Sequence, residues 1–319
     1  MKVIILSSEL KQKHRDLVMT TAAKVNADVC FAESEDAIPD EYRDAEILYG
    51  FGMKTAASSS DLKWLCVPSA GVDYLLKPGV FANEDCIITN SAGAYGVSIA
   101  EHIIMVSLMM MRQMTTIYRQ SISGKWGSRL PQKSLKDCRI TVLGTGDIGC
   151  NFARRAAAFE PASITGISRS GACSEASFDR ICRSDALDEI LPETDLLVMC
   201  LPDTAETRGI LSGERIGLLP DGAYVVNVGR GSAIDEDALA DSLESGHLAG
   251  AALDVFAREP LPSDSRLWNT ENLLITPHVA GNLTLGYTLD KNVEMFCEDL
   301  LNYGEGRPLK YVIDKKLGY

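Results

Sequence analysis

Histidine is the side chain whose ordinary pKa best suits proton transfer near neutral pH, and this chain of 319 residues has four. His278 follows the apolar run 273–275, so we expect it just beyond the carboxyl end of a buried strand, where ligands bind in open α/β sheets. His14 lies in a charged stretch and His247 in a helix-end turn, which predicts exposure for both. His102 lies in an apolar helical stretch and is expected to be packed between domains. His278 is therefore the favoured acid–base candidate.

Two other segments place charged side chains directly after predicted strands. Residues 227–231 put Arg230 between two glycines, and arginine can bind a carboxylate through two parallel hydrogen bonds. The alternative for Arg230 is an arginine on a surface turn. Residues 253–260 contain Asp254 and Glu259, either of which could orient a histidine and raise its pKa. These residue types predict a site that binds a carboxylate and moves a proton beside it.

A G-x-G-x-x-G segment at residues 144–149 follows the apolar run 140–143 and precedes a predicted helix. In this context Gly144 permits a tight turn, Gly146 lets the backbone approach a pyrophosphate, and Gly149 lets the helix pack on the strand. Backbone N–H groups at the start of the helix would hold the phosphates. The segment predicts dinucleotide binding, and a purely structural turn is the alternative.

The turn after the next predicted strand bears on the choice of dinucleotide. An enzyme that uses NAD carries an acid there, because a carboxylate accepts a hydrogen bond from the ribose 2′-OH. This chain has Ser168, Arg169 and Ser170 instead, and no acid before Glu175. Hydroxyls and a guanidinium would hold the 2′-phosphate that a carboxylate would repel. The turn predicts NADP(H) in preference to NAD(H), with a solvated surface arginine as the alternative.

Short apolar runs bounded by turn residues alternate with helical stretches along the chain, which indicates an α/β fold. In the second half these runs are typical of a doubly wound parallel sheet. The expected strands are residues 3–6, a short strand around Val29, and residues 47–49, 64–67, 87–89, 140–143, 164–167, 196–201, 224–228, 249–253 and 273–275.

The helical stretches include one long, almost entirely apolar segment over 97–118. We expect Ser98 to cap it, with Glu101 completing a capping box. Residues 121–131, rich in Gly, Ser and Pro, follow as a connection. The other expected helices are residues 148–158, 236–245 and 284–303, with Gly304 as the stop signal of the last.

Composition excludes several classes of partner. A net charge of −13 argues against nucleic acid or an anionic membrane surface. The nine cysteines are scattered without a C-x-x-C motif, which predicts buried, reduced thiols rather than disulfides or a metal site. The longest apolar stretch, 103–111, is too short to cross a bilayer. We expect a cytoplasmic protein that binds no metal.

With these motifs in this order, the chain resembles the D-isomer-specific 2-hydroxyacid dehydrogenase family over nearly its whole length. The resemblance rests on residues 144–149, 227–231, 253–260 and 276–281, and residues 98–102 and 201–209 also fit. Within the family it is most similar to the glyoxylate/hydroxypyruvate reductases, because of the Ser-Arg-Ser turn and residues 227–231.

The resemblance implies a catalytic set of Arg230, Glu259 and His278. His278 would donate a proton to the substrate carbonyl oxygen as a hydride arrives from the nicotinamide. Glu259 would hydrogen-bond the other ring nitrogen and favour the protonated imidazole. Arg230 would bind the substrate carboxylate and polarise the reacting carbonyl.

The resemblance also implies contacts to substrate and cofactor. The loop 68–73 would offer backbone N–H groups to the substrate carboxylate through Ser69, Ala70 and Gly71, although a simple Gly-containing turn is the alternative. Asp254 would contact the nicotinamide carboxamide. The full set of implied dinucleotide contacts is Gly144, Gly146, Asp147, Ile148, Gly149, Ser168, Arg169, Ser170, Leu201, Pro202, Thr207, Val228, Gly229, Asp254 and Gly281.

The family fold implies two Rossmann-like domains with the active site in the cleft between them. A flavodoxin-like substrate domain would comprise residues 1–96 and 284–319, and the NAD(P)-binding Rossmann domain would comprise residues 97–283. Members of the family are usually dimers through the cofactor domain, so we expect a homodimer. Trp126 matches a region that in some reductases reaches the partner's active site; an interface or core tryptophan is the alternative.

The sequence thus predicts NADPH-preferring reduction of a small 2-keto acid, such as glyoxylate or hydroxypyruvate, to a D-2-hydroxy acid. One alternative is a dinucleotide-sensing, protein-binding module of the corepressor type. Another is oxidation of phosphite or a similar oxyanion by the same residues. Asn282 and Leu283 depart from the commonest family sequence and leave the substrate open, whereas Glu259 argues against formate dehydrogenases, which carry glutamine in that role.

Overall fold

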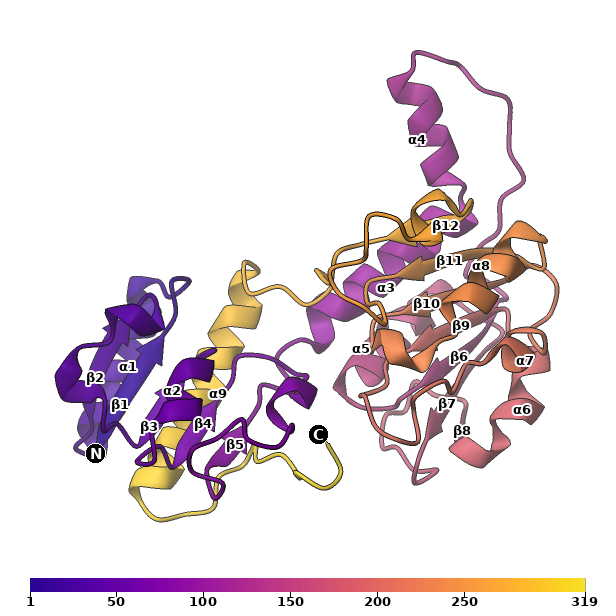
Figure 1. Cartoon of the computed structure of the whole chain (residues 1–319). Coiled ribbons are helices and arrows are strands. Elements are labelled where there is room, and N and C mark those ends of the chain that lie inside the picture. The colour runs from indigo at the N-terminus through magenta and orange to yellow at the C-terminus, as the bar shows by residue number, and fades with distance from the viewer. Residues whose placement is uncertain (319) are drawn as a thin grey trace. The chain divides into compact units, whose positions relative to one another are not determined.

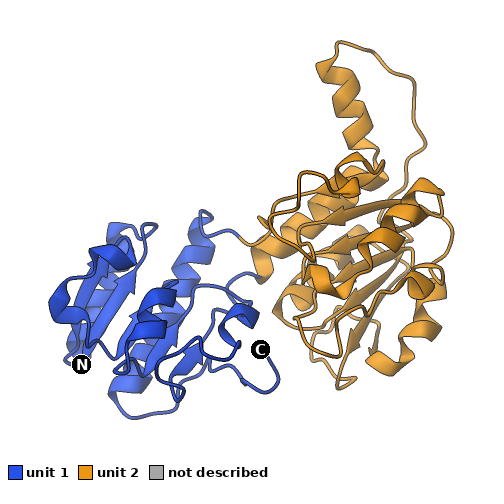
Figure 2. Ribbon diagram, viewed as in Figure 1, with its two compact units in different colours: residues 1–95, 282–319 blue, residues 96–281 orange. Residues whose placement is uncertain are grey.

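The computed structural model describes residues 1–318, and these form two compact units (Figure 2). Unit 1 combines Met1–Tyr95 with the C-terminal segment that begins at Asn282, and unit 2 is the continuous stretch Gly96–Gly281. The fold class is confirmed, since both units are parallel sheets covered by helices (Figure 1). The assignment of substrate and cofactor roles to the two units stays a prediction.

Unit 1 contains a five-stranded parallel sheet in the order β2-β1-β3-β4-β5. Alternate residues of β1 enter two cores: Val3 and Ile5 face α1 and α9, whereas Ile4 and Leu6 belong to the core on the opposite face. Because both faces are covered, the strand is a continuous apolar run. The elements are β1 Lys2–Leu6, α1 Gln12–Lys24, β2 Asp28–Ala32, β3 Ile47–Tyr49, α2 Met53–Ser58, β4 Trp64–Cys66, β5 Ile87–Thr89 and α9 Gly286–Gly304, with single 3-10 turns at Glu35–Ala37, Asp40–Tyr42 and Asp73–Leu75.

Helix α9 completes the core of unit 1. Trp64 of β4 stacks on Phe296 and Tyr303 of this helix, at 5.5 and 5.6 Å between ring centroids. Its indole N–H donates to Thr89 Oγ1 of β5 at 2.8 Å, so the buried polar atom is satisfied. Residues from both ends of the sequence therefore build one hydrophobic core.

Unit 2 contains a seven-stranded parallel sheet in the order β12-β11-β10-β9-β6-β7-β8. The strand order reverses between β6 and β9, which creates the switch point where ligands bind in such sheets. The elements are α3 Gly96–Met111, α4 Met114–Ile122, β6 Arg139–Leu143, α5 Asp147–Ala156, β7 Ser163–Ser168, β8 Arg180–Arg183, α6 Leu187–Ile190, β9 Leu196–Met199, α7 Gly213–Ile216, β10 Ala223–Asn227, α8 Glu236–Glu244, β11 Leu248–Leu253 and β12 Leu273–Ile275, with single 3-10 turns at Ala157–Phe159, Ser184–Ala186, Leu191–Glu193, Gly231–Ala233 and Arg266–Asn269.

The long helix expected over 97–118 is instead two helices, so this prediction is wrong. Helix α3 ends at Met111 and α4 begins at Met114, because Gln113 adopts a left-handed conformation with φ of 56°. The prediction of Ser98 as N-cap is also wrong: α3 begins at Gly96, so Ser98 lies buried within its first turn. The break lets α4 project away from the rest of unit 2 (Figure 1).

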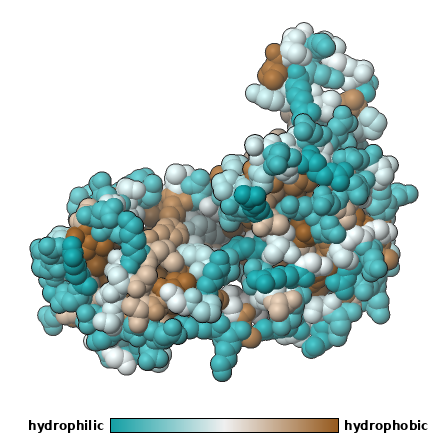
Figure 3. Space-filling view, viewed as in Figure 1, coloured by the Kyte–Doolittle hydropathy of each residue, from teal (hydrophilic) through white to brown (hydrophobic). Residues whose placement is uncertain are grey.

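The projecting segment exposes large apolar side chains. Tyr118 is 62% exposed, Ile122 68%, and Trp126 fully exposed, which excludes a core role for Trp126. Apolar atoms are visible on this arm in Figure 3. Among helices of residues 1–318, none has the length and apolar character needed to cross a membrane.

Candidate active site

The acid–base candidate and its acidic partner lie in direct contact. Nδ1 of His278 is 2.7 Å from Oε2 of Glu259, and the other carboxylate oxygen, Oε1, accepts a hydrogen bond from Phe256 N at 2.9 Å. The backbone thus fixes the carboxylate, and the carboxylate fixes the imidazole. Because Nδ1 faces Glu259, Nε2 is the ring nitrogen available to exchange a proton with a ligand. The His278 side chain is 51% exposed, so a ligand can reach it.

The backbone at His278 is strained in a way that positions its ring. Its φ is 53°, a left-handed value that is uncommon for a residue other than glycine. The His278 N–H donates to Asp254 O at 2.8 Å and to Thr276 O at 3.0 Å, and these bonds hold the conformation. The strain is therefore maintained by the ends of β11 and β12 rather than by the loop alone.

Asp254 fastens the segment that carries His278. It is 3% exposed, and its Oδ1 accepts from Thr276 Oγ1 at 2.6 Å and from Val279 N at 2.9 Å. Its Oδ2 accepts from Ala280 N at 3.0 Å. The proposed contact of Asp254 with a nicotinamide stays a prediction, but its positioning role is visible in these bonds. The signal for this role in the sequence is an acid directly after a buried strand.

His102 of α3 lies beside this network. Its Nε2 is 3.4 Å from Thr276 Oγ1, and since the threonine hydrogen is donated to Asp254, the imidazole N–H is the donor. Burial lowers the pKa of His102 below its ordinary value, with the negative charge of Asp254 opposing that shift.

Arg230 lies on a loop fastened by a buried amide. Asn227, at the end of β10, is completely buried; its Nδ2 donates to Arg230 O at 2.9 Å and its Oδ1 accepts from Gly229 N at 3.0 Å. Gly231 lies so close to the backbone of Phe256 and Ala257 that a Cβ would be 1.8 Å from Phe256 C. This contact joins the Arg230 loop to the loop that carries Glu259. Sequence reasoning did not single out Asn227, although a buried amide at a strand end before a Gly-rich loop is a readable signal.

The glycine-rich segment has the geometry that dinucleotide binding requires. Gly144 has a φ of 96°, and α5 begins directly after Gly146. A Cβ on Gly149 would lie 2.1 Å from Gly144 O, so only glycine permits this approach of helix to strand. A Cβ on Gly146 would meet nothing within 4 Å, which leaves open space above the first N–H groups of α5. A pyrophosphate fits this arrangement.

The Ser168-Arg169-Ser170 turn begins at the last residue of β7, the strand next to β6 in the sheet. Ser168 Oγ accepts from Gly171 N at 3.1 Å, which closes the turn, and Arg169 is exposed. The pKa of Glu206 is held below its usual range by a backbone hydrogen bond, then by Thr204, with a contribution from the charge of Arg169. Glu206 belongs to the loop that follows β9.

That loop, residues 201–209, is held in shape by its own hydrogen bonds. Thr207 Oγ1 donates to Pro202 O at 2.6 Å and accepts from Thr204 N at 2.9 Å. Asp203 accepts from Arg208 and from Ser232 Oγ, the latter at 2.8 Å, so it links this loop to the segment after Arg230. Val228 N donates to Met199 O, which keeps the ends of β9 and β10 together.

The predicted substrate loop, residues 68–73, belongs to unit 1 and follows β4. Ser69 Oγ donates to Gly71 O at 2.8 Å, and Asn90 Nδ2 donates to Ala70 O at 2.8 Å. The side chain of Asn90 therefore fixes the carbonyl side of this loop. Its contact with a substrate stays a prediction.

Two of the remaining histidines differ from expectation. The prediction that His14 is solvated is wrong: it is 3% exposed, because α1 packs on α9, where Asp290 lies 2.7 Å from His14 Nε2. The prediction that His247 is exposed is also wrong: it is partly buried, with Nδ1 2.7 Å from Asp221 Oδ1. Neither histidine lies at the carboxyl end of a strand in unit 2. Within residues 1–318, no three His, Cys, Asp or Glu side chains gather as a metal site.

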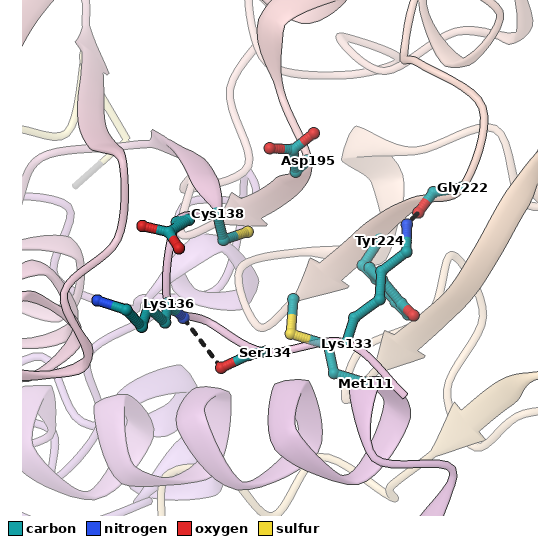
Figure 4. Close-up of a pocket in the computed structure, with 9 residues that line it drawn as sticks. Met111, Lys133, Ser134, Lys136, Cys138, Asp195, Gly222 and Tyr224 are labelled. Atoms are coloured by element: carbon teal, nitrogen blue, oxygen red, sulfur yellow. Dashed lines mark hydrogen bonds between the residues drawn. The ribbon is translucent and has the colours of Figure 1, made fainter. Parts of the chain in front are cut away.

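A cavity of about 320 Å³ lies away from these residues, near the amino ends of β6, β9 and β10 (Figure 4). Two of its charged side chains, Lys133 and Asp195, already have partners. Lys133 Nζ donates to Gly222 O at 3.1 Å, and Asp195 binds the Arg139 guanidinium at 2.7 Å. We do not count this cavity as part of the candidate active site.

The sequence and the fold match those of known proteins. The family model for the D-isomer specific 2-hydroxyacid dehydrogenase NAD binding domain matches residues 104–280. A glyoxylate/hydroxypyruvate reductase A of Salmonella typhimurium is 29% identical over 264 residues, covering 81% of this chain and 82% of that protein. The chain therefore belongs to the D-isomer specific 2-hydroxyacid dehydrogenase family.

Solved structures agree with this assignment. A D-isomer specific 2-hydroxyacid dehydrogenase family protein from Aeromonas salmonicida superposes with a TM-score of 0.87 at 32% identity, covering 98% of this chain and 99% of that one. An NADPH-dependent glyoxylate/hydroxypyruvate reductase from Sinorhizobium meliloti, in complex with NADP and sulfate, has a TM-score of 0.80 at 26% identity, covering 100% and 99%. The protein is an NAD(P)-dependent D-2-hydroxyacid dehydrogenase or 2-keto acid reductase.

Proposed function

We propose that this protein reduces a small 2-keto acid, such as glyoxylate or hydroxypyruvate, to a D-2-hydroxy acid and prefers NADPH to NADH. The observation that carries the proposal is the His278–Glu259 pair, 2.7 Å apart, in which the Glu259 loop also packs against the loop that carries Arg230. All three loops follow neighbouring strands, β10, β11 and β12, at their carboxyl ends. This is where ligands bind in doubly wound sheets.

Each of these residues has a distinct role in the proposed reaction. A bound nicotinamide supplies the hydride. His278 gives a proton from Nε2 to the substrate carbonyl oxygen, and the electron pair of the broken C=O π bond takes that proton. Glu259 accepts from Nδ1 and keeps the ring oriented throughout. Arg230 binds the substrate carboxylate, so the carbonyl is held next to His278.

The preference for NADPH rests on the turn after β7. Ser168, Arg169 and Ser170 stand where an acid would select NAD, and Arg169 is exposed. The Sinorhizobium relative is described as NADPH-dependent and was crystallised with NADP. A guanidinium is suited to a phosphate because it offers a fixed fork of N–H donors.

We further propose a homodimer in the cytoplasm, formed through α4 and the segment that follows it. The support is the exposure of Tyr118, Ile122 and Trp126 on one projecting arm, since monomers rarely expose apolar groups together in this way. Trp126→Ser together with Ile122→Ser is expected to shift the mass measured by light scattering from dimer to monomer. A wild-type monomer would refute the proposal.

The function is tested by following NADPH and NADH consumption with glyoxylate, hydroxypyruvate, pyruvate and phenylpyruvate at neutral pH. Rapid loss of NADPH with one of these acids, and slow loss of NADH, is the expected result. Tight dinucleotide binding without turnover would favour the dinucleotide-sensing alternative. Reduction of NADP by phosphite, without turnover of any keto acid, would favour the oxyanion alternative.

A further inference from the structure

Two thiols meet beside the dinucleotide loop. Sγ of Cys150 and Sγ of Cys173 are 3.5 Å apart. Cys150 follows Gly149 in α5, and Cys173 lies in the loop that follows the Ser168-Arg169-Ser170 turn. Both thiols point to one carbonyl of the glycine-rich segment, since Thr145 O lies 3.2 Å from Cys150 Sγ and 3.7 Å from Cys173 Sγ.

This pair differs in exposure from six of the other seven cysteines. Cys150, Cys173 and Cys200 are partly exposed, and the other six are buried. The loop that carries Cys173 lies at the surface, because Ser170, Ala172 and Ser174 around it are exposed. A disulfide needs the two sulfur atoms to approach by about 1.5 Å, to a bond length near 2.05 Å. A surface loop can make that shift, whereas a packed strand cannot.

We propose that Cys150 and Cys173 form a reversible disulfide that weakens binding of the NADPH 2′-phosphate. The part concerning NADPH rests on the proposed function, because it assumes that residues 168–170 hold that phosphate. Cys173 is three residues from Ser170, so the bond ties the phosphate-binding turn to α5. The bond also consumes both S–H groups that now face Thr145 O.

The oxidant is a low-molecular-weight disulfide such as glutathione disulfide. The Cys173 thiolate attacks one glutathione sulfur, forms a mixed disulfide and releases one glutathione thiolate. Cys150 then loses its proton and attacks the Cys173 sulfur, which releases the second glutathione thiolate. Two protein thiols are oxidised to one disulfide, and one glutathione disulfide is reduced to two glutathione molecules.

The surroundings set the order of these steps. Burial raises the pKa of Cys150 to about 12, aided by the hydrogen bond and the charge of Cys173. Cys150 is therefore a poor nucleophile towards a molecule in solution. Its attack on a mixed disulfide at Cys173 is intramolecular, and the 3.5 Å separation gives it a high effective concentration. Cys173 is the residue that reacts first with an external oxidant.

The test begins with the reduced protein and with protein treated with glutathione disulfide. Peptide mapping by mass spectrometry should find the peptides of Cys150 and Cys173 joined, and dithiothreitol should separate them. Cys200→Ser is the matched control: it removes the third partly exposed cysteine and should leave the cross-link intact. Cys173→Ser should abolish it, and Cys150→Ser should leave a stable glutathione adduct on Cys173.

Binding of both cofactors is then measured by fluorescence titration of the two forms. Oxidation should raise the Kd for NADPH about tenfold, because that factor corresponds to the loss of one hydrogen bond to a charged group. The Kd for NADH should change less than about twofold. If the cross-linked Cys150–Cys173 peptide is absent, the proposal that these two cysteines form a disulfide is overturned. If the cross-link forms but the Kd for NADPH is unchanged, the proposed effect of the disulfide on NADPH binding is overturned. If the reduced protein binds NADPH and NADH with equal affinity, the proposed NADPH preference is refuted instead. The peptide map then still shows whether Cys150 and Cys173 form the disulfide.

Discussion

Replacement of Glu259 by glutamine changes the partner of His278 with little change in shape. Phe256 N donates to one carboxylate oxygen at 2.9 Å, so the amide oxygen of a glutamine belongs at that position. The amide NH₂ then faces His278 Nδ1, where a carboxylate oxygen now lies at 2.7 Å. Because an NH₂ group only donates, Nδ1 must accept, and the ring cannot carry a proton on that nitrogen.

The size of the effect follows from the bond that is lost. A hydrogen bond to a charged group contributes about 1.5–3 kcal/mol, and each 1.36 kcal/mol in the barrier is about a factor of ten in rate. Glu259→Gln should therefore lower kcat for reduction by about 10- to 100-fold. KM for the keto acid should change little, because Arg230 binds the substrate carboxylate in the proposed mechanism.

The assay is steady-state NADPH consumption, with the free energy of unfolding measured in parallel by urea. Glu236→Gln is the matched control, because Glu236 Oε1 accepts from Ala257 N at 2.7 Å in the same loop and a glutamine oxygen can replace it. Its kcat should stay within about threefold of wild type. The reasoning is refuted if Glu259→Gln retains kcat, or if both variants lose it equally.

Arg169→Ala should reduce the preference for NADPH over NADH about tenfold in kcat/KM. Arg180 is an exposed arginine on β8, and Arg180→Ala should leave the preference unchanged. An unaltered preference in Arg169→Ala contradicts the proposed contact of Arg169 with the phosphate. Asp254→Asn places a donor against a backbone N–H and should lower the free energy of unfolding by about 1–3 kcal/mol in urea titrations. The exposed Asp264→Asn serves as its control, and equal stability of the two variants would count against the positioning role. His102 has a pKa lowered by burial, so the unfolded chain takes up a proton before the folded one as pH falls. Stability should therefore decline as pH drops below the ordinary histidine pKa and level off below the folded one, and His102→Gln should lose that part of the slope; an identical slope in the variant would disprove this.

The elements that position the site could be predicted because buried parallel strands are short apolar runs. The runs that end before Gly144, Arg230 and His278 were all expected, and the structure has strands there. The edge strand β8 was missed, because Arg180 and Arg183 flank only two residues between them and one side of the strand has no neighbour. An edge strand needs little apolar character, so its composition resembles that of a loop.

Tertiary contacts decided what the sequence could not. The 97–118 stretch has no proline or glycine to mark a break, and the reversal at Gln113 shows in no local signal. The reversal at Gln113 is stabilised by Gln132, whose side chain exchanges hydrogen bonds with Arg112 at 2.8 and 3.1 Å. His14 is buried for a similar reason, because its partner Asp290 is far away in the sequence. Only contacts over such distances fix these two features.

Unit 2 is continuous in the sequence and unit 1 is not, which sets an order for folding during synthesis. Residues 1–95 leave the ribosome first, but one face of their sheet is covered by α9, through Phe296 and Tyr303 on Trp64. That apolar face is not covered by α9 until the whole of unit 2 has been translated. Unit 2, by contrast, can form its own core before α9 has been synthesised. The period during which this face lacks α9 is set by the translation of residues 96–285. A circular permutant that joins the original termini and begins at residue 96 would make unit 1 from one uninterrupted stretch and remove that period.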